Sequence, residues 1–222
     1  MKYQAFIFDM DGTIINTIQD IGDSVNYSLQ KHGFPLISYE ECTSYLGDGS
    51  VKLIQRALHD ENSPAFQEVF DTYYNYYMEH FCVKTKAYPH LIPALKYASS
   101  LGILLFVYTN KPQDIANIVL KHCFGDGLFE KLVGIPLGGK TKPSPDAFWE
   151  ACKEYHLDYS RCAYFGDSVT DIKTAYNLGV KDIYSVLWGY QSEEKLRSVP
   201  IERKAYLKDP SEIEIVAQGL IL

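Results

Sequence analysis

Apolar residues along the chain follow two patterns, and each predicts a different kind of structure. Residues 3–8 form a short, almost continuous apolar run, which is typical of a buried strand. From residue 18 to residue 81 the apolar positions recur at helical spacing, and no convincing strand interrupts them. The expected helices run from Ile18 to just before Gly33 and then over about 39–46, 50–60 and 64–81.

Beyond Pro89 the pattern changes to short apolar runs that alternate with helical periodicity. The expected strands cover residues 103–108, 131–134, 161–165, 183–187 and 205–207. The expected helices cover residues 90–100, 113–122, 145–156, 171–178 and 212–220. Such alternation implies an α/β fold, with a parallel sheet and helices on both faces. We therefore predict an α/β core of residues 1–15 and 87–222 and an inserted all-helical domain of residues 16–86.

Composition narrows the classes of protein to which the chain can belong. Its 222 residues are 46% hydrophobic and 22% charged, which is ordinary for a globular protein with a buried core. The net charge of −7 argues against nucleic-acid or anionic-membrane partners, which need a basic surface. None of the five cysteines forms a C-x-x-C pair, and no apolar run approaches membrane-spanning length. We expect free thiols and a cytoplasmic protein.

Polar and charged residues gather where the predicted strands end, which is where ligands bind in open parallel sheets. They are Asp9 and Asp11 after the first strand, Thr109, Asn110 and Lys111 after the second, Lys140 and Lys142 after the third, and Asp167, Ser168 and Asp171 after the fourth. Taken alone, each segment is also explained as a turn, a loop or a helix N-cap. Their order and common placement favour a single site.

The chemistry of these residue types is consistent. Several carboxylates together indicate a hard divalent cation such as Mg²⁺, and a threonine hydroxyl with a lysine suits anionic phosphate oxygens. An aspartate can attack phosphorus and form an aspartyl-phosphate. A second aspartate can protonate the leaving oxygen and later deprotonate water. The adjacent pair Asp9 and Asp11 then makes sense if one is the nucleophile and a metal ligand and the other carries the proton.

Four segments in this order resemble the haloacid dehalogenase superfamily of hydrolases, in its phosphoglycolate phosphatase-like group. They are "FDMDGT", "VYTNKP", "KTKPSPDAF" and "YFGDSVTDI", and "GDGSVKLIQRAL" and "VLWGY" are similar to that group as well. The resemblance implies a Rossmann-like core with an inserted helical cap, in agreement with the pattern above. It implies Asp9 as nucleophile, Asp11 as general acid/base, and Thr109, Asn110 and Lys142 around the phosphoryl group. The implied Mg²⁺ ligands are Asp9, the backbone carbonyl of Asp11, Asp167 and, in the outer shell, Asp171.

The resemblance also bears on the reaction. Relatives that cleave carbon–halogen or carbon–phosphorus bonds lack the second aspartate, so Asp11 disfavours those reactions here. Asn16 stands where many relatives have aspartate, and Lys140 is expected to face solvent. The leading hypothesis is a Mg²⁺-dependent phosphatase. A beta-phosphoglucomutase-like phosphomutase, a pyrophosphatase, a sugar-phosphate or nucleotide phosphatase, and a catalytically idle binding protein stay open.

The helical insertion carries the candidate residues for substrate choice. In "LGDGS" the glycines Gly47 and Gly49 allow the backbone to approach a ligand closely. Lys52 and Arg56, one helical turn apart, could bind a second anionic group, although a solvated helix face explains them too. The expected partner is a small phosphorylated metabolite, with 2-phosphoglycolate as the first choice. The protein is expected to be a monomer or a small homo-oligomer.

Overall fold

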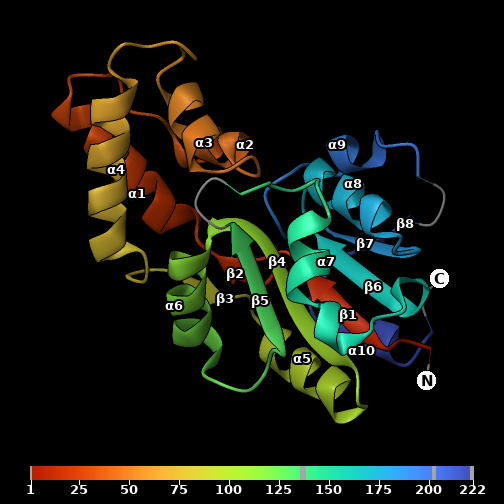
Figure 1. Cartoon of the computed structure of the whole chain (residues 1–222). Coiled ribbons are helices and arrows are strands. Elements are labelled where there is room, and N and C mark those ends of the chain that lie inside the picture. The colour runs from red at the N-terminus through yellow and green to blue at the C-terminus, as the bar shows by residue number, and fades with distance from the viewer. Residues whose placement is uncertain (1, 136–138, 202–203, 221–222) are drawn as a thin grey trace.

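A computed structural model describes residues 2–135, 139–201 and 204–220, and a parallel sheet forms its centre (Figure 1). Within the described residues this sheet has six strands in the order β5-β4-β1-β6-β7-β8, and all neighbours pair in parallel. The strands are β1 (Ala5–Phe8), β4 (Leu104–Pro112), β5 (Lys131–Ile135), β6 (Cys162–Gly166), β7 (Asp182–Val186) and β8 (Lys204–Leu207). The predicted α/β fold class is confirmed.

Helices cover both faces of the sheet. They are α5 (Leu91–Ser100), α6 (Gln113–Phe124), α7 (Asp146–Ala151), α8 (Val169–Leu178), α9 (Glu193–Arg197) and α10 (Glu212–Ala217), with short 3-10 turns at Lys153–Tyr155 and Tyr159–Arg161. Alternate residues of β1 divide between two hydrophobic cores. Phe6 and Phe8 pack with residues of α5, α6 and α10, whereas Ala5 and Ile7 pack with residues of α7, α8 and α9. This period of two is what a strand buried on both faces requires.

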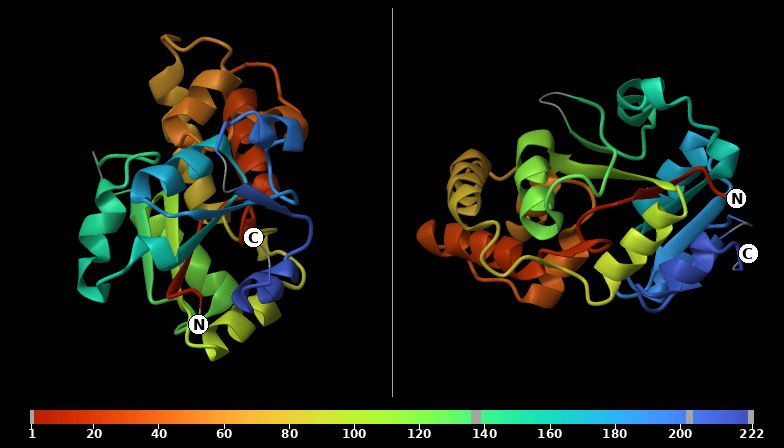
Figure 2. Two further views of the ribbon diagram at one scale, coloured as in Figure 1. Left: turned by 90° about the vertical axis from the view of Figure 1, so that its right-hand side faces the viewer. Right: turned by 90° about the horizontal axis from the view of Figure 1, so that it is seen from below.

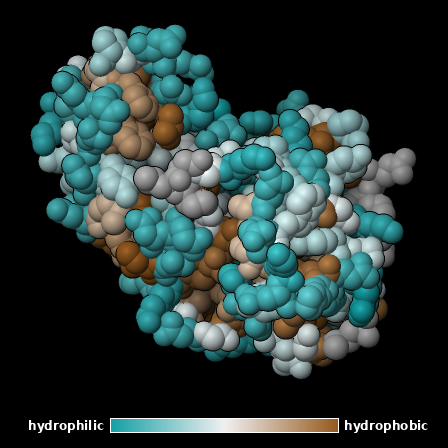
Figure 3. All heavy atoms as spheres, viewed as in Figure 1, coloured by the Kyte–Doolittle hydropathy of each residue, from teal (hydrophilic) through white to brown (hydrophobic). Residues whose placement is uncertain are grey.

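Residues 18–80 contain four helices that pack on one another beside the sheet. They are α1 (Ile18–Lys31), α2 (Tyr39–Tyr45), α3 (Ser50–Ala57) and α4 (Phe66–His80). They form a separate lobe in the space-filling view, with hydrophilic residues along its rim (Figure 3). Two further views place this lobe at one end of the sheet, and α10 at the opposite end (Figure 2). We call the segment from α1 to α4 the helical insertion.

Two chain crossings join the helical insertion to the core, and they lie side by side. β2 (Ile15–Asn16) and β3 (Lys86–Ala87) form a small antiparallel pair. The buried carboxylate of Asp20 accepts hydrogen bonds from the backbone N–H groups of Lys84 at 2.9 Å and Thr85 at 2.8 Å. These bonds hold the start of α1 against the returning chain, which fixes where the insertion meets the core.

Several predicted elements differ in detail from the structure. The helix predicted over 145–156 is shorter, because α7 ends at Ala151 and a 3-10 turn follows it. The sequence pattern did not predict α9, since in its five residues only Leu196 is buried and one apolar residue makes no periodicity. The two-residue strands β2 and β3 were missed as well, because only their mutual pairing makes them strands. No helix in the described part of the chain is long and apolar enough to span a membrane.

The central aromatic packing generates a prediction about stability. Phe165 of β6 contacts Phe6, Phe8 and Tyr184 at ring-centroid distances of 4.9, 4.6 and 5.1 Å. The variant Phe165→Ala leaves a cavity at the centre of the sheet and should lower the free energy of unfolding by about 3–5 kcal/mol. Urea denaturation measures this loss. The matched variant Leu36→Ala changes a side chain that is 58% exposed and should cost less than about 0.5 kcal/mol; equal losses would contradict the assigned core.

Candidate active site

The first pair of aspartates lies where β1 ends and the chain turns back. The Asp9 backbone N–H donates to the Phe165 carbonyl at 2.9 Å, so Asp9 still belongs to the sheet edge. Beyond it the chain curls, and the carbonyl of Met10 accepts from the N–H groups of Ile14 and Ile15 at 3.0 and 3.1 Å. Gly12 has a φ of +88°, and a Cβ there would lie 2.3 Å from Asp167 Oδ2. A glycine is therefore required for the turn and for the close approach of Asp167.

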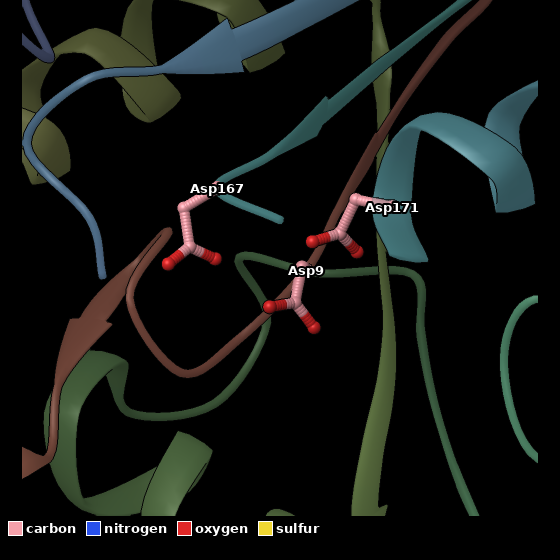
Figure 4. Close-up of side chains that lie close together, drawn as sticks. All are labelled: Asp9, Asp167 and Asp171. Carbon is pink, nitrogen blue, oxygen red and sulfur yellow. The ribbon is translucent and has the colours of Figure 1, made fainter. Parts of the chain in front are cut away.

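Three buried carboxylates meet at this edge of the sheet. Asp9 comes from the end of β1, Asp167 directly follows β6, and Asp171 lies in the first turn of α8. One oxygen from each lies within 4.8 Å of the others, and the three side chains point into the same space (Figure 4). Parallel strands end at the same sheet edge, which is why residues far apart in sequence converge here.

Asp171 and Asp167 are oriented by their own hydrogen bonds. The Asp171 carboxylate accepts from the Ser168 backbone N–H at 3.1 Å, and Ser168 Oγ accepts from the Asp171 backbone N–H at 3.2 Å, a capping box at the start of α8. The Ser168 hydroxyl also donates to the Asp171 carboxylate. The same carboxylate accepts from the Tyr164 hydroxyl at 3.1 Å. Asp167 accepts from the Tyr190 backbone N–H at 2.6 Å and from the Thr13 hydroxyl at 3.3 Å.

Lys142 supplies the positive charge among these carboxylates. Its Nζ lies 2.5 Å from Asp9 Oδ1 and 2.7 Å from Asp171 Oδ1, and its side chain is 3% exposed. The Lys142 backbone N–H donates to Asn110 Oδ1 at 2.7 Å, so Asn110 positions the loop that carries the lysine. Thr109, the last partner expected from the sequence, is buried and lines the same pocket.

The electrostatics of the cluster favour an additional cation. Burial, followed by the charge of Asp171, raises the pKa of Asp9 and raises the pKa of Asp167 to about 7. Burial opposes the charge on Lys142, but Asp171 and Asp9 hold its pKa above the usual value, so it stays an ammonium ion. One ammonium thus faces three carboxylates. A hard divalent cation with oxygen ligands fits the donor set and the excess of negative charge.

Asp11 lies outside the carboxylate cluster. Its two oxygens each lie 3.1 Å from the Nζ of Lys111, and Oδ1 also accepts from the Thr17 hydroxyl at 2.8 Å. The side chain of Asp11 is 22% exposed, more than those of the three clustered aspartates. Asp11 therefore lines the pocket between the core and the helical insertion without joining the cluster.

A pocket joins these residues to the helical insertion. Asp9, Asp11, Thr109 and Lys142 line its core side. Leu46, Gly47, Leu53, Tyr73 and Tyr77 line the side formed by the insertion. The carbonyl of Gly47 accepts from Asn110 Nδ2 at 3.1 Å, so the insertion closes directly onto the strand ends.

Two cationic residues of α3, considered from the sequence as possible ligands of a second anionic group, do not line this pocket. Lys52 pairs with Glu61 at 3.5 Å and its side chain is 44% exposed, which corrects its expected substrate-binding role. Arg56 donates to the Tyr45 carbonyl at 2.8 Å and pairs with Asp48 at 2.5 Å, so it braces the turn before α3. Lys140 pairs with Asp146 at the surface, where the sequence placed it. Gly47, in contrast, lines the pocket.

Other pocket residues were not assigned a function from the sequence. Lys111 belongs to the quoted segment "TNKP", and its position at a strand end was the available signal. Tyr77 belongs to the aromatic run "YYNYY", which packing in the core explains equally well. The hydroxyl of Tyr190 lies 2.8 Å from the Thr17 backbone N–H, across one of the crossings to the insertion, and only the fold brings these residues together.

Comparison with known proteins agrees with this geometry. A curated phosphoglycolate phosphatase from Neisseria meningitidis is 31% identical, covering 84% of this chain and 81% of that protein. The crystal structure of a candidate phosphoglycolate phosphatase from Lactobacillus delbrueckii superimposes with a TM-score of 0.88 at 28% identity, covering 100% of this chain and 99% of that one. A candidate beta-phosphoglucomutase from Thermotoga maritima, at 21% identity, covers 98% of this chain and 100% of its own with a TM-score of 0.74, which shows a shared fold alone.

A family model described as "Haloacid dehalogenase-like hydrolase" matches residues 6–184. The match covers all but the first residue of β1, the whole helical insertion, and the segments that carry Lys142, Asp167 and Asp171. The sequence resemblance is thereby confirmed. This chain belongs to the haloacid dehalogenase-like hydrolase family.

Proposed function

We propose that this chain is a Mg²⁺-dependent phosphatase that hydrolyses a small phosphomonoester through an aspartyl-phosphate on Asp9, with 2-phosphoglycolate as the preferred substrate. One observation carries the proposal: Asp9 contacts Lys142 in the pocket between the core and the insertion, and Asp11 lines the same pocket two residues later. The phosphoglycolate phosphatases at about 30% identity support the phosphatase activity and the substrate class.

The proposed reaction has two steps, and both use groups on the core side of the pocket. Lys142 and Thr109 hold the oxygens of the phosphoryl group while a carboxylate oxygen of Asp9 attacks phosphorus. A bond forms between Asp9 and phosphorus, the ester P–O bond breaks, and Asp11 donates a proton to the departing oxygen. In the second step Asp11 takes a proton from water as that water attacks phosphorus. The bond to Asp9 then breaks, and inorganic phosphate leaves.

The metal has a proposed place among the clustered carboxylates. Asp9, Asp167 and the backbone carbonyl of Asp11 would hold Mg²⁺, and Asp171 would support it from the outer shell while keeping Lys142 in position. When bound, the ion neutralises charge on the phosphoryl oxygens and on the carboxylates. The observed excess of carboxylates over ammonium groups supports this role.

Residues 16–86 act, in this proposal, as a cap that closes over the strand ends. The contacts from Asn110 to the Gly47 carbonyl and from Thr170 to Asp48, at 3.1 and 3.4 Å, support a closed arrangement that keeps water from the phosphoryl group. A cap that contacts the strand ends in this way favours a compact metabolite over nucleic acids or proteins. A cytoplasmic location and a monomer or small homo-oligomer stay predictions.

The role of Asp9 is tested by removing its nucleophilic oxygen. The variant Asp9→Asn should lower kcat on a generic aryl phosphate by at least about 10³-fold, because binding and electrostatics alone remain. Excess chelator should abolish wild-type turnover, and added Mg²⁺ should restore it. Steady-state release of phosphate measures both effects. The surface variant Asp146→Asn is the control and should keep full activity; an active Asp9→Asn enzyme rejects the mechanism.

The role of Asp11 is tested by the fate of the covalent intermediate. An aryl phosphate has a good leaving group that needs little protonation, so Asp11→Asn should mainly slow attack by water on the aspartyl-phosphate. Rapid-quench experiments should then trap more phosphorylated protein than in the wild type. If the variant turns over normally with no excess of the intermediate, Asp11 is not the proton carrier. Transfer of the trapped group to a sugar phosphate rather than to water indicates a phosphomutase instead.

The raised pKa of Asp167 predicts how metal stabilisation depends on pH. Between the ordinary aspartate value of about 3.9 and about 7, the folded metal-free protein keeps a proton that the unfolded chain releases. The stability of the metal-free protein therefore falls as pH rises through this range. Mg²⁺ needs the ionised carboxylate, so it should raise Tm more at pH 8 than at pH 5.5.

Thermal denaturation with and without MgCl₂ at these two pH values measures this effect without any substrate. The variant Asp167→Asn, which cannot ionise at this position, should lose most of the pH dependence. The variant Asp158→Asn at the surface should retain it. An equal shift in Tm at both pH values in the wild type argues against Asp167 as a ligand.

A further inference from the structure

A second buried ammonium group faces the pocket. The Nζ of Lys111 lies 3.1 Å from both carboxylate oxygens of Asp11, and its side chain is 5% exposed. Burial opposes this charge, but Asp11 holds the pKa of Lys111 above its usual value. In the part of the chain that the structure describes, Lys142 has two carboxylate partners, whereas Lys111 has Asp11 alone. Lys111 can therefore bind a further anion without leaving its place.

A buried hydroxyl group lies beside this ammonium group. Among the described residues no acceptor lies within hydrogen-bond distance of the Tyr77 hydroxyl; the Lys111 ammonium interacts with its oxygen, and Tyr77 is buried and lines the pocket. The Nζ of Lys111 lies 5.2 Å from the centre of the Tyr77 ring, and Tyr73 stacks on that ring at 5.7 Å. Burial raises the pKa of Tyr77 to about 12, while Lys111 lowers it, so the hydroxyl is a neutral donor at pH 7. Buried donors of this kind normally have an acceptor.

We propose that Lys111 and Tyr77 together bind a second anionic group of the substrate, a carboxylate one carbon away from the ester oxygen. This inference rests on the proposed phosphatase function and says how the same pocket selects its substrate. One carboxylate oxygen accepts from the ammonium group and the other from the phenol, and hydrogen bonds to an ion are stronger than those between neutral groups.

The contact between Lys111 and Asp11 sets how far the substrate's carboxylate can lie from its ester oxygen. Asp11 has to reach the ester oxygen in order to protonate it, and Lys111 lies directly on Asp11. A carboxylate bonded to the carbon that bears the ester oxygen is then close enough to meet Lys111, which describes compact molecules such as 2-phosphoglycolate. Lys111 and Lys142 are the cationic side chains among the described pocket residues, since Lys52 is paired elsewhere.

The two groups come from different parts of the chain. Lys111 lies at the end of β4 in the core, whereas Tyr77 projects from α4 in the helical insertion. The carboxylate is therefore recognised only when the insertion is in place over the strand ends. A phosphomonoester without the carboxylate makes no hydrogen bond with the Tyr77 hydroxyl or with the Lys111 ammonium group. The enzyme therefore discriminates against such a substrate.

The test compares 2-phosphoglycolate with 2-hydroxyethyl phosphate, in which a hydroxymethyl group replaces the carboxylate. The wild type should prefer 2-phosphoglycolate in kcat/KM. Lys111→Met and Tyr77→Phe should each lower the ratio of the two kcat/KM values by about 10-fold or more, as expected for losing a hydrogen bond to a charged group. A substitution of Lys111 that disturbs Asp11 should lower turnover of both substrates alike, and this general loss cancels in the ratio of the two kcat/KM values. Lys52→Met removes the same charge outside the pocket and should leave the ratio unchanged.

A binding measurement separates recognition from catalysis. In an Asp9→Asn background, calorimetry should show that Lys111→Met weakens binding of 2-phosphoglycolate about 10-fold or more, while inorganic phosphate loses much less. Circular dichroism verifies that the variants fold. If Lys111→Met does not fold, the milder variant Tyr77→Phe decides, because it keeps the ring and removes only the hydroxyl group.

The outcomes separate the two proposals. An unchanged ratio in both pocket variants overturns the carboxylate site, as does a reduced ratio in Lys52→Met alone. A wild type that hydrolyses an aryl phosphate but does not prefer 2-phosphoglycolate over 2-hydroxyethyl phosphate overturns it too, and the phosphatase function stands. If the wild type hydrolyses no phosphomonoester, the proposed function fails and the carboxylate site fails with it.

Discussion

The crowding of carboxylates at the ends of β1 and β6 is the constraint on which the rest of the site depends. Asp9, Asp167 and Asp171 lie within 4.8 Å of one another and are nearly excluded from water. Buried like charges at such distances must keep a proton or gain a cation. Lys142 satisfies part of this need by contacting both Asp9 and Asp171. The remaining negative charge is what makes the cluster suited to a divalent ion and a phosphoryl group.

The core supports this crowding with backbone as well as side chains. A Cβ at position 189 would lie 2.2 Å from the Cβ of Asp167, so only glycine lets this loop pass the carboxylate. The following N–H, that of Tyr190, then donates to Asp167 at 2.6 Å. Asn110 has a similar supporting role, since its side chain binds the backbone of Lys142 on one side and Gly47 on the other. The site is thus held by elements from most of the core.

The helical insertion and the core contribute different properties to one pocket. The core supplies the charged groups at its strand ends, where parallel strands bring them together. The insertion supplies a mostly apolar wall, in which Tyr77 is a buried polar exception. In the proposed function, groups of the core act on the phosphoryl group, whereas Lys111 of the core and Tyr77 of the insertion together select the attached group. A different insertion on the same core would then change the choice of substrate.

The sequence alone determined the features that depend on local order. Apolar runs predicted the strands of the core, helical periodicity predicted the insertion, and the segments after the strands placed Asp9, Lys142 and Asp167 at one sheet edge. This works because the two faces of a parallel sheet must be apolar and because parallel strands end together. Short elements such as β2 and α9 could not be predicted in this way, since two to five residues are too few to show the periodicity of a strand or a helix.

Only the tertiary structure decided which cations face the pocket. Lys52 and Lys111 look equally available in the sequence, yet Lys52 lies at the surface with Glu61 while Lys111 is buried against Asp11. Likewise, nothing in the run of tyrosines singles out Tyr77, whose distinction is a buried hydroxyl with no hydrogen-bond acceptor among the described residues. A side chain's partner depends on how the insertion packs against the core. That packing sums many weak contacts between residues far apart in the chain, so local sequence order cannot determine it.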